Sequence, residues 1–264
     1  MKVVFIGAGP GAADLLTLRG AKAIANADIV IWAASLVHPS VLDHARPGTR
    51  IVDSATLTLE ETLALYTEAR DAGLTVARIH SGDPSLWGAL HEQLAACRQL
   101  GVETEVVPGV SSFTAAAAAI QRELTVPEVA QSVILTRLEG GKTPMPSRES
   151  IRSFAAHGTT MAIFLSAARS GQLASELAAG GYPPETPVVV AYQVTWPDEL
   201  IARCELSTLE DTVKAHKLWK HTLFLVGWAL SDADTRSHLY HPGHFHGFRR
   251  ADPLARKALR SRRG

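Results

Sequence analysis

Short apolar runs alternate along the chain with longer stretches in which apolar residues recur at helical spacing. The runs predict strands at residues 2–6, 28–32, 50–52, 75–80, 103–107, 132–137, 160–165, 187–192, 200–204 and 223–226. The stretches between them predict helices at residues 14–25, 36–45, 58–71, 89–100, 112–120, 150–156, 172–179 and 207–215. Strands that alternate with helices of this length are typical of an α/β protein with a mainly parallel sheet.

Three local signals refine this prediction. Asp14 is expected at the positive end of the first helix, because a carboxylate is stabilised near a helix N-terminus. Glu61 follows Thr58 by three residues, which is the spacing of a capping box and predicts a helix start there. The strands over 187–192 and 200–204 are close enough in the sequence to pair as a hairpin, so the second half of the chain is expected to hold a mixed sheet.

The strand–helix pattern restarts near residue 132, and this restart divides the chain. We expect residues 1–122 to form an N-terminal α/β domain with a mainly parallel sheet, and residues 123–235 to form a C-terminal α/β domain with a mixed sheet. Residues 236–264 are expected to be a basic tail that also carries histidines. The cationic residues of its end are Arg249, Arg250, Arg256, Lys257, Arg260, Arg262 and Arg263. A tail of this composition is typically solvated or disordered, and less often contacts a polyanion.

Composition places the chain among soluble globular proteins. It has 264 residues, of which 46% are hydrophobic and 20% charged, and its formal net charge is zero. A zero net charge gives no long-range field that would recruit nucleic acid or a membrane surface. Cys97 and Cys204 are far apart and lack metal-like spacing, so we expect no disulfide framework and a reducing cytoplasm. We find no leader pattern and no apolar run of about 18 residues, so neither export nor a membrane span is expected.

The first strand ends in a glycine-rich turn that matches a dinucleotide-binding fingerprint. Gly7, Gly9 and Ala12 occupy the positions of G-x-G-x-x-G/A. A nicotinamide enzyme of that type also needs an acidic residue at the end of the second strand, and residues 31–35 contain none. Pro10 removes a backbone N–H from the loop that would hold the pyrophosphate. A nicotinamide or flavin oxidoreductase is therefore only a distant alternative.

Three loops at the carboxyl ends of predicted strands carry distinctive chemistry, and ligands of open α/β sheets bind at such ends. These loops are the glycine turn and the segments over 81–88 and 108–113. Asp83 offers a carboxylate acceptor to a ligand, or it is the N-cap of the following helix. Ser111 and Ser112 are likewise either ligand contacts or N-caps.

Four stretches resemble those of the tetrapyrrole methyltransferases that use S-adenosylmethionine, in the same order and with similar spacing. They are G-A-G-P-G-A-A-D-L-L-T-L-R-G at 7–20, S-G-D-P-S-L-W-G at 81–88, V-P-G-V-S-S-F-T at 107–114 and V-I-L-T-R at 133–137. Three more stretches resemble the branch of this family that methylates carbon 11 of precorrin-4 in cobalamin biosynthesis, at 32–39, 123–137 and 239–249. The likeness covers the chain to about residue 249, which is far more than any single motif.

The resemblance implies a tetrapyrrole methylase-like fold, a homodimer of two-domain subunits, S-adenosyl-L-methionine as cofactor and S-adenosyl-L-homocysteine as product. The cofactor would lie in a cleft between the domains, and the tetrapyrrole in an adjoining trough. Carried over by position, the cofactor-binding residues would be Pro10, Ser81, Gly82, Asp83, Leu86, Ser111, Ser112, Leu165, Tyr192, Gln193, Val194 and Thr222. The substrate would be precorrin-4. Cobalt-precorrin-4 and methylation at another ring position are the alternatives within the family.

A precorrin macrocycle carries many carboxylates, so its trough is expected to hold cationic side chains and backbone N–H donors. Arg137 and Lys142 flank the loop that we expect to cover the trough, and Trp87 directly follows the cofactor loop. These three residues are the candidates for substrate binding, although each is also explained as a surface charge or a packing residue. We assign no catalytic residue, because a sulfonium methyl group is already activated and mainly needs alignment with its nucleophile.

Four histidines near the end of the chain suggest a metal site, namely His238, His241, His244 and His246. They lie in a segment rich in proline and glycine, which offers no helical face for a set of ligands. We therefore predict no metal there and interpret His246 as a packing or interface residue.

Overall fold

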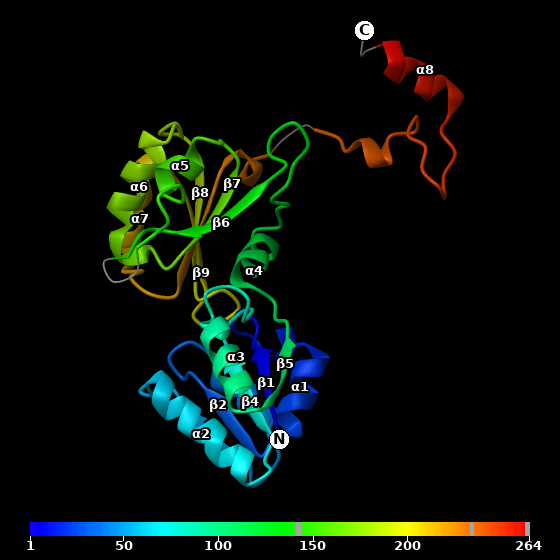
Figure 1. Ribbon diagram of the computed structural model, residues 1–264. Coiled ribbons are helices and arrows are strands. Elements are labelled where there is room, and N and C mark those ends of the chain that lie inside the picture. The colour runs from blue at the N-terminus through cyan, green and yellow to red at the C-terminus, as the bar shows by residue number, and fades with distance from the viewer. Residues whose placement is uncertain (141–143, 233–234, 262–264) are drawn as a thin grey trace.

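The computed structural model describes residues 1–140, 144–232 and 235–261, and the strands in these ranges form two five-stranded sheets. Figure 1 shows the first sheet, blue to green, below the second, green to orange, and each sheet has helices of its own. Across the described ranges, no helix combines the length and the apolar character that a membrane span requires.

The first sheet is entirely parallel, as the alternation of strands and helices predicts. Its order is β3-β2-β4-β1-β5, and every neighbouring pair runs parallel. The strands are β1 (Lys2–Gly7), β2 (Ile29–Trp32), β3 (Arg50–Asp53), β4 (Val76–His80) and β5 (Glu103–Val107). β1 lies between β4 and β5 and is buried from Val3 to Gly7, as expected for a central strand covered on both faces.

Helices cover both faces of this sheet. One face holds α1 (Leu18–Ala25) and a 3₁₀ helix (Pro39–His44), which share a buried apolar cluster with β1 and β2. The other face holds α2 (Leu59–Asp71) and α3 (Leu90–Gln99), which pack with the opposite side chains of the same strands. The thiol of Cys97 is buried in this second cluster.

The first predicted helix starts later than expected. α1 begins at Leu18, because the hydroxyl of Thr17 accepts a hydrogen bond from the N–H of Gly20 and caps the helix there. Asp14 lies in a separate 3₁₀ turn (Ala13–Leu15), so its predicted place at the N-terminus of α1 is wrong. The hydroxyl of Thr17 thus accepts a hydrogen bond from a free N–H group of the first turn of α1, and no carboxylate is needed there.

The next two predicted helices have different outcomes. Residues 36–45 form a 3₁₀ helix rather than an α-helix, and it covers only residues 39–44. The capping box predicted at Thr58 and Glu61 is confirmed, because both of its reciprocal hydrogen bonds are present.

The second sheet is mixed, as predicted. Its order is β6-β7-β10-β8-β9, in which β6 and β7 are parallel and the other neighbours are antiparallel. The strands are β6 (Val133–Arg137), β7 (Thr160–Phe164), β8 (Pro187–Tyr192), β9 (Leu200–Glu205) and β10 (Thr222–Val226). β8 and β9 form the expected hairpin, with Tyr192 opposite Leu200.

Among the described α-helices, three pack on one face of the second sheet and one packs on the other. α5 (Ile151–Ala155), α6 (Ser170–Ala179) and α7 (Leu209–His216) form a core with the first face. The alanine-rich α4 (Ser112–Ala119) lies against the opposite face. The sequence places α4 in the N-terminal domain, residues 1–122, yet it packs on the second sheet. The position of the domain boundary therefore stays a prediction.

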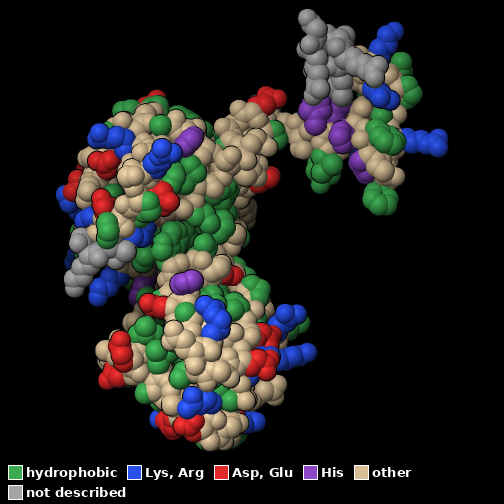
Figure 2. All heavy atoms as spheres, viewed as in Figure 1, with side chains coloured by type: hydrophobic (Ala, Val, Ile, Leu, Met, Phe, Trp, Pro, Cys, Tyr) green, Lys and Arg blue, Asp and Glu red, His purple; other side chains and the backbone are tan. Residues whose placement is uncertain are grey.

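The C-terminal segment stands apart from both sheets in Figure 1 and ends in α8 (Pro253–Ser261). Its composition predicts a solvated or disordered tail, but the structure shows local order: Arg249 Nη2 donates to the carbonyl oxygens of Leu239 (2.6 Å) and His241 (3.0 Å). Figure 2 shows histidines of this segment grouped beside apolar side chains. Within the described ranges, no three His, Cys, Asp or Glu side chains are grouped so that they could hold a metal ion.

Candidate functional site

Three glycines allow the ends of β1, β4 and β5 to meet backbone against backbone. A Cβ atom at Gly7 would lie 2.6 Å from the carbonyl oxygen of Gly82 and from the Cα atom of Gly109. A Cβ atom at Gly109 would lie 2.0 Å from the same oxygen. Backbone atoms cannot swing aside as the end of a flexible side chain can. The contact of these three residues, which we call the glycine junction, therefore excludes side chains.

Hydrogen bonds join the glycine turn to the loop after β4. The N–H of Ala8 donates to the carbonyl oxygen of His80, and the N–H of Gly82 donates to that of Gly9, both at 2.8 Å. The turn that resembles a pyrophosphate cradle thus directs backbone groups to a neighbouring loop of its own sheet. This use of the turn counts against the nicotinamide alternative.

Asp83 joins the loops after β4 and β5. Its Oδ1 atom accepts hydrogen bonds from the backbone N–H (2.8 Å) and the hydroxyl of Ser85, and its Oδ2 atom accepts one from the N–H of Gly109 (2.9 Å). The N-cap alternative for Asp83 is wrong, because α3 begins at Leu90 and Ala89 is its N-cap residue. Burial raises the pKa of Asp83, but the hydrogen bonds from Ser85 and Gly109 outweigh burial and hold this pKa below its usual value.

A cavity of about 570 Å³ lies where the two sheets meet, and residues from both sheets line it. Eleven of the twelve predicted cofactor residues are among them, namely Pro10, Ser81, Gly82, Asp83, Leu86, Ser111, Ser112, Leu165, Gln193, Val194 and Thr222. They come from loops beside β1, β4, β5, β7, β8 and β10. The fold thus brings together most of a set that is scattered along the whole chain.

Of the other predicted residues that the structure describes, only one lines the cavity. Tyr192 does not line the cavity: side chains alternate across a strand, so Ala191 faces the cavity while Tyr192 packs with the core on the opposite face. Of the substrate candidates, Trp87 lines the cavity and Arg137, at the end of β6, does not. Lys142 lies outside the described residues.

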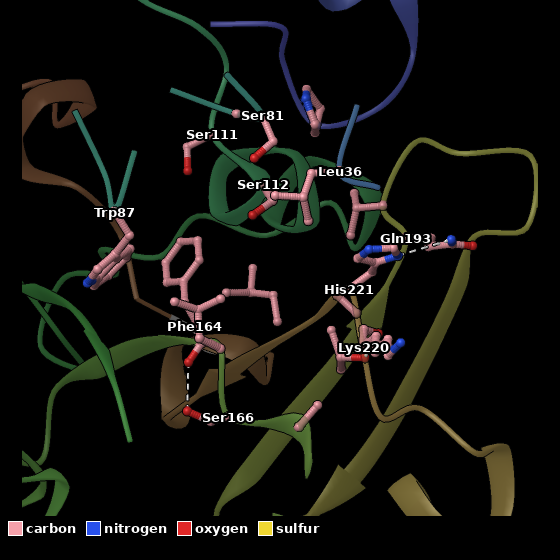
Figure 3. A pocket seen from close by; sticks show the side chains of 18 of the residues that line it. Leu36, Ser81, Trp87, Ser111, Ser112, Phe164, Ser166, Gln193, Lys220 and His221 are labelled. Carbon is pink, nitrogen blue, oxygen red and sulfur yellow. Dashed lines mark hydrogen bonds between the residues drawn. The ribbon is translucent and has the colours of Figure 1, made fainter. Parts of the chain in front are cut away.

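Figure 3 shows that the lining side chains divide by chemistry. At one end, the rings of Trp87 and Phe164 lie with their centroids 4.7 Å apart. At the other end lie Gln193, Lys220 and His221. The hydroxyls between the two ends belong to Ser81, Ser111 and Ser112. The cavity therefore has Trp87 and Phe164 at one end, hydroxyls in the middle, and a basic, polar end at which Trp196 stacks on His221.

Many residues that line the cavity were not predicted from the sequence. The additional lining residues are Ser35, Leu36, Phe164, Ser166, Ala167, Ala168, Ala191, Trp196, Trp219, Lys220, His221 and Leu223. The rule that ligands bind at the carboxyl ends of strands holds for parallel sheets. In a mixed sheet, the start of an antiparallel strand lies at the same edge, and β10 is antiparallel to β7 and β8, which brings residues 219–221 there. The predicted hairpin indicated a mixed sheet but did not give the direction of β10.

Trp196, in the turn between β8 and β9, connects the two sides of the cavity. Its indole Nε1–H donates to the carbonyl oxygen of Pro10 (3.0 Å), and a Cβ atom at Gly11 would lie 2.2 Å from the indole ring. Next to it, the hydroxyl of Thr195 accepts a hydrogen bond from the N–H of Ala12 (2.9 Å). These contacts attach the second sheet to the glycine turn of the first.

Several lining residues adopt the left-handed backbone region that residues other than glycine avoid. Their φ angles are 52° at Trp87 and Leu165, 43° at Gln193 and 50° at His221. Such conformations cost about 1 kcal/mol or more each, and they persist only where the surrounding contacts fix them. Their concentration around one cavity is typical of a binding site.

Replacing Asp83 by Asn is expected to make stability less sensitive to acid. Because the pKa of Asp83 is lowered on folding, its carboxylate stabilises the fold above the unfolded pKa of about 3.9, and this contribution is lost as pH falls through the folded pKa. Urea titrations between about pH 2 and pH 6 give the free energy of unfolding. The wild type should lose more stability across this range than Asp83→Asn, and equal losses would contradict the role of the carboxylate.

Relatives of the chain share its length. The family model of the Tetrapyrrole (Corrin/Porphyrin) Methylases matches residues 2–210. A cobalt-precorrin-4 C(11)-methyltransferase of Priestia megaterium is 42% identical, over 95% of this chain and 98% of its own. A precorrin-4 C(11)-methyltransferase of Rhodococcus erythropolis is 46% identical, over 88% of this chain and 92% of its own.

Solved structures share the architecture. The X-ray structure of a cobalt-precorrin-4 methyltransferase is 41% identical and has a TM-score of 0.85, covering 88% of this chain and 96% of its own. A uroporphyrin-III C-methyltransferase from Thermus thermophilus, crystallised with S-adenosylhomocysteine, is 26% identical and has a TM-score of 0.74, covering 87% and 99%. The match to the family over most of the chain, with the same two-sheet fold, shows that this protein belongs to the tetrapyrrole methylases.

Proposed function

We propose that the protein transfers a methyl group from S-adenosyl-L-methionine to carbon 11 of precorrin-4, giving precorrin-5 in cobalamin biosynthesis. The observation that carries the proposal is the cavity between the sheets, which gathers eleven of the twelve residues expected to bind the cofactor. The names of two relatives support the ring position, because both are C(11)-methyltransferases that act on precorrin-4 or its cobalt form.

The cavity fits S-adenosyl-L-methionine in size and chemistry. Its volume of about 570 Å³ lies in the range that one small ligand occupies. Leu86, Leu165 and Val194 supply apolar surface for a planar base, and Ser81 and Ser112 supply hydroxyls for polar groups. The bound S-adenosylhomocysteine of the Thermus thermophilus enzyme supports the same class of cofactor here.

Asp83 keeps one acceptor position for the cofactor. A carboxylate has about four lone-pair positions. Ser85 fills two of them on Oδ1, and Gly109 fills one on Oδ2. The remaining position on Oδ2 can accept a hydrogen bond from a ribose hydroxyl, while the loop contacts hold the carboxylate in place. We assign Asp83 to binding rather than to proton transfer, since its lowered pKa makes it a weak base.

The work of the chain in this reaction is alignment. When bound, the cofactor supplies a methyl group that is already activated for displacement. The walls must then hold the nucleophilic carbon in line with the methyl group and the sulfur, and positioning of this kind can lower a barrier by roughly 7–11 kcal/mol. Residues fixed in left-handed conformations, such as Leu165 and Gln193, give the walls a defined shape.

Incubation with cofactor carrying a carbon-13 methyl group tests the proposal. We expect the label at carbon 11 of the macrocycle, detected by mass spectrometry and carbon-13 NMR. Parallel incubations with precorrin-4 and cobalt-precorrin-4 distinguish the metal-free from the cobalt-loaded substrate. Label at another ring carbon, or in neither macrocycle, would contradict the proposal.

Calorimetry tests the class of cofactor separately. S-adenosyl-L-homocysteine is expected to bind with measurable heat, and NADH is not. Heat with NADH and none with S-adenosyl-L-homocysteine would instead favour an oxidoreductase built on the glycine turn.

We also propose that the protein is a cytoplasmic homodimer that binds neither nucleic acid nor membranes. Cys97 and Cys204 are free thiols, which suits a reducing compartment. Large apolar side chains are exposed on the C-terminal segment, namely Leu239, Tyr240, Phe245, Phe248 and Leu254, and a second subunit would remove such a surface from water. Sedimentation velocity on the full chain should give the mass of two chains, whereas the mass of one chain at micromolar concentration would contradict the dimer.

A further inference from the structure

Two side chains at the basic end of the cavity have no role in the reaction as described so far. Lys220 and His221 lie there, directly before β10, and both line the cavity (Figure 3). Among the described lining residues, Lys220 is the only lysine or arginine. It takes part in none of the ion pairs within the described ranges. Its exposed ammonium group is thus available to an anionic ligand.

The turn that carries Lys220 is held in place on both sides. Leu218 is buried, and the hydroxyl of Thr222 donates to the carbonyl oxygens of Leu218 (3.3 Å) and Lys220 (2.9 Å). The backbone of the lysine is therefore fixed, although its side chain reaches into solvent. A fixed backbone means that binding a partner orders the side chain alone and costs little further backbone entropy.

His221 is oriented by two neighbours. Its Nδ1 atom lies 3.4 Å from the Nε2 atom of Gln193, and its ring stacks on Trp196 with centroids 6.2 Å apart and planes 18° apart. When the Gln193 amide donates to Nδ1, the neutral ring carries its proton on Nε2. The Nε2–H group of His221 is then a hydrogen-bond donor on the residue that directly follows Lys220.

The size of the cavity limits where a macrocycle can lie. A volume of about 570 Å³ suits one small ligand, so the cofactor and a four-ring macrocycle cannot both lie inside. The macrocycle therefore lies across the mouth, where the exposed lining residues are. Trp87 is 43% exposed and Leu165 is 70% exposed, so both offer apolar contact to its faces. Lys220 is the cationic side chain of the described lining that the carboxylates of the macrocycle would contact.

We propose that Lys220 and His221 form a carboxylate-binding subsite that holds one acetate or propionate group of the tetrapyrrole. The ammonium group supplies charge, and the imidazole N–H supplies a directed hydrogen bond. Holding one carboxylate fixes the rotation of the macrocycle in its own plane, and with it the ring carbon that faces the methyl group. The inference rests on the proposed function, because it takes a polycarboxylate tetrapyrrole as the substrate.

Binding of uroporphyrin, an octacarboxylate tetrapyrrole, tests the subsite without turnover, by quenching of tryptophan fluorescence. Lys220→Met is expected to raise its Kd about fivefold at low salt, with a smaller effect as ionic strength rises, because the lysine is exposed. Lys220→Arg should restore binding. Lys217→Met is the matched control: it removes the same charge from the same turn, but Lys217 does not line the cavity, so its Kd should stay within twofold.

Three further measurements can overturn the proposal. Affinity for S-adenosyl-L-homocysteine should not change in Lys220→Met; a fivefold loss would mean that the lysine binds the cofactor instead. The octamethyl ester of uroporphyrin should bind the wild type and Lys220→Met equally, and a difference would exclude a role for the carboxylates. His221→Asn, which tolerates a left-handed backbone, should also weaken uroporphyrin binding and leave the ester unaffected; wild-type affinity would remove His221 from the subsite.

Turnover separates this inference from the proposed function. With precorrin-4, Lys220→Met should raise KM and increase the share of product methylated at carbons other than 11. A wild type that methylates carbon 11, with Lys220→Met equal to Lys217→Met in both measurements, would refute the subsite alone. A wild type that binds uroporphyrin through Lys220 but methylates nothing would refute the proposed function alone.

Discussion

Gly109→Ala is expected to destabilise the protein by at least about 3 kcal/mol, or to prevent folding. The new Cβ atom would lie 2.0 Å from the carbonyl oxygen of Gly82 and 2.7 Å from the Cα atom of Gly7, and both belong to backbone that the sheet holds in place. Relief would require β1, β4 and β5 to separate at the ends that carry the cofactor loops. Urea titration of the purified variant gives the free energy of unfolding, and calorimetry with S-adenosyl-L-homocysteine reports on the loops.

Two other glycines show whether the loss of stability in Gly109→Ala comes from the steric contact of the new Cβ atom or from backbone strain. Gly101 has a φ angle of 68° but open space around its Cβ position, so Gly101→Ala should cost only about 1 kcal/mol through backbone strain. Gly247 also has open space and no left-handed φ, so Gly247→Ala should change stability by less than about 0.5 kcal/mol. If Gly109→Ala were no more destabilising than Gly101→Ala, the backbone contact at the glycine junction would not be as tight as the structure indicates.

Trp196→Ala is expected to lower stability by about 2 kcal/mol and to weaken the binding of S-adenosyl-L-homocysteine. Truncating a buried tryptophan costs about 3–5 kcal/mol, and the half-buried indole of Trp196 belongs below that range. The variant also loses the hydrogen bond to Pro10, the ring contact with His38 at 5.0 Å and part of the cavity wall. Trp196→Phe keeps much of the ring and loses the N–H, so it should cost about 1 kcal/mol.

Trp228→Ala is the control for this prediction. Trp228 is 42% exposed and does not line the cavity, so its removal should leave affinity for S-adenosyl-L-homocysteine within twofold of the wild type. Titration calorimetry on the three variants and the wild type measures the difference. Equal affinity in Trp196→Ala and Trp228→Ala would show that Trp196 has no part in the binding wall.

Much of the fold could be predicted because its signals are local and repeated. The run from Val3 to Ile6 is apolar at every position, which is typical of a strand covered on both faces, and β1 is an interior strand of the first sheet, between β4 and β5. The hairpin of β8 and β9 followed from two strands close together in the sequence. Asp14 misled the prediction of the helix start, because Thr17 satisfies the same need one turn later.

The site was harder to predict, because its lining residues come from segments that are far apart in the sequence. Only the pairing and direction of the strands bring these segments together. The cofactor loops after β4 and β5 could be placed by their motifs. Tyr192 could not, since a shift of one residue along β8 moves a side chain to the other face of the sheet. Trp196 and Lys220 became visible only when antiparallel pairing brought the turn after β8 and the start of β10 to one edge.

A cavity walled by both sheets also links their unfolding. A ligand that needs Ser81 from the first sheet and Thr222 from the second binds only when both are folded. By mass action, a ligand at a hundred times its Kd adds about 2.7 kcal/mol to the stability of that joint state and nothing to a state in which either sheet has opened. Without ligand, the coupling between the two sheets rests on direct contacts such as those of Thr195 and Trp196 with the glycine turn. Bound ligand adds to this coupling, so a higher cofactor concentration makes the unfolding of the chain more cooperative.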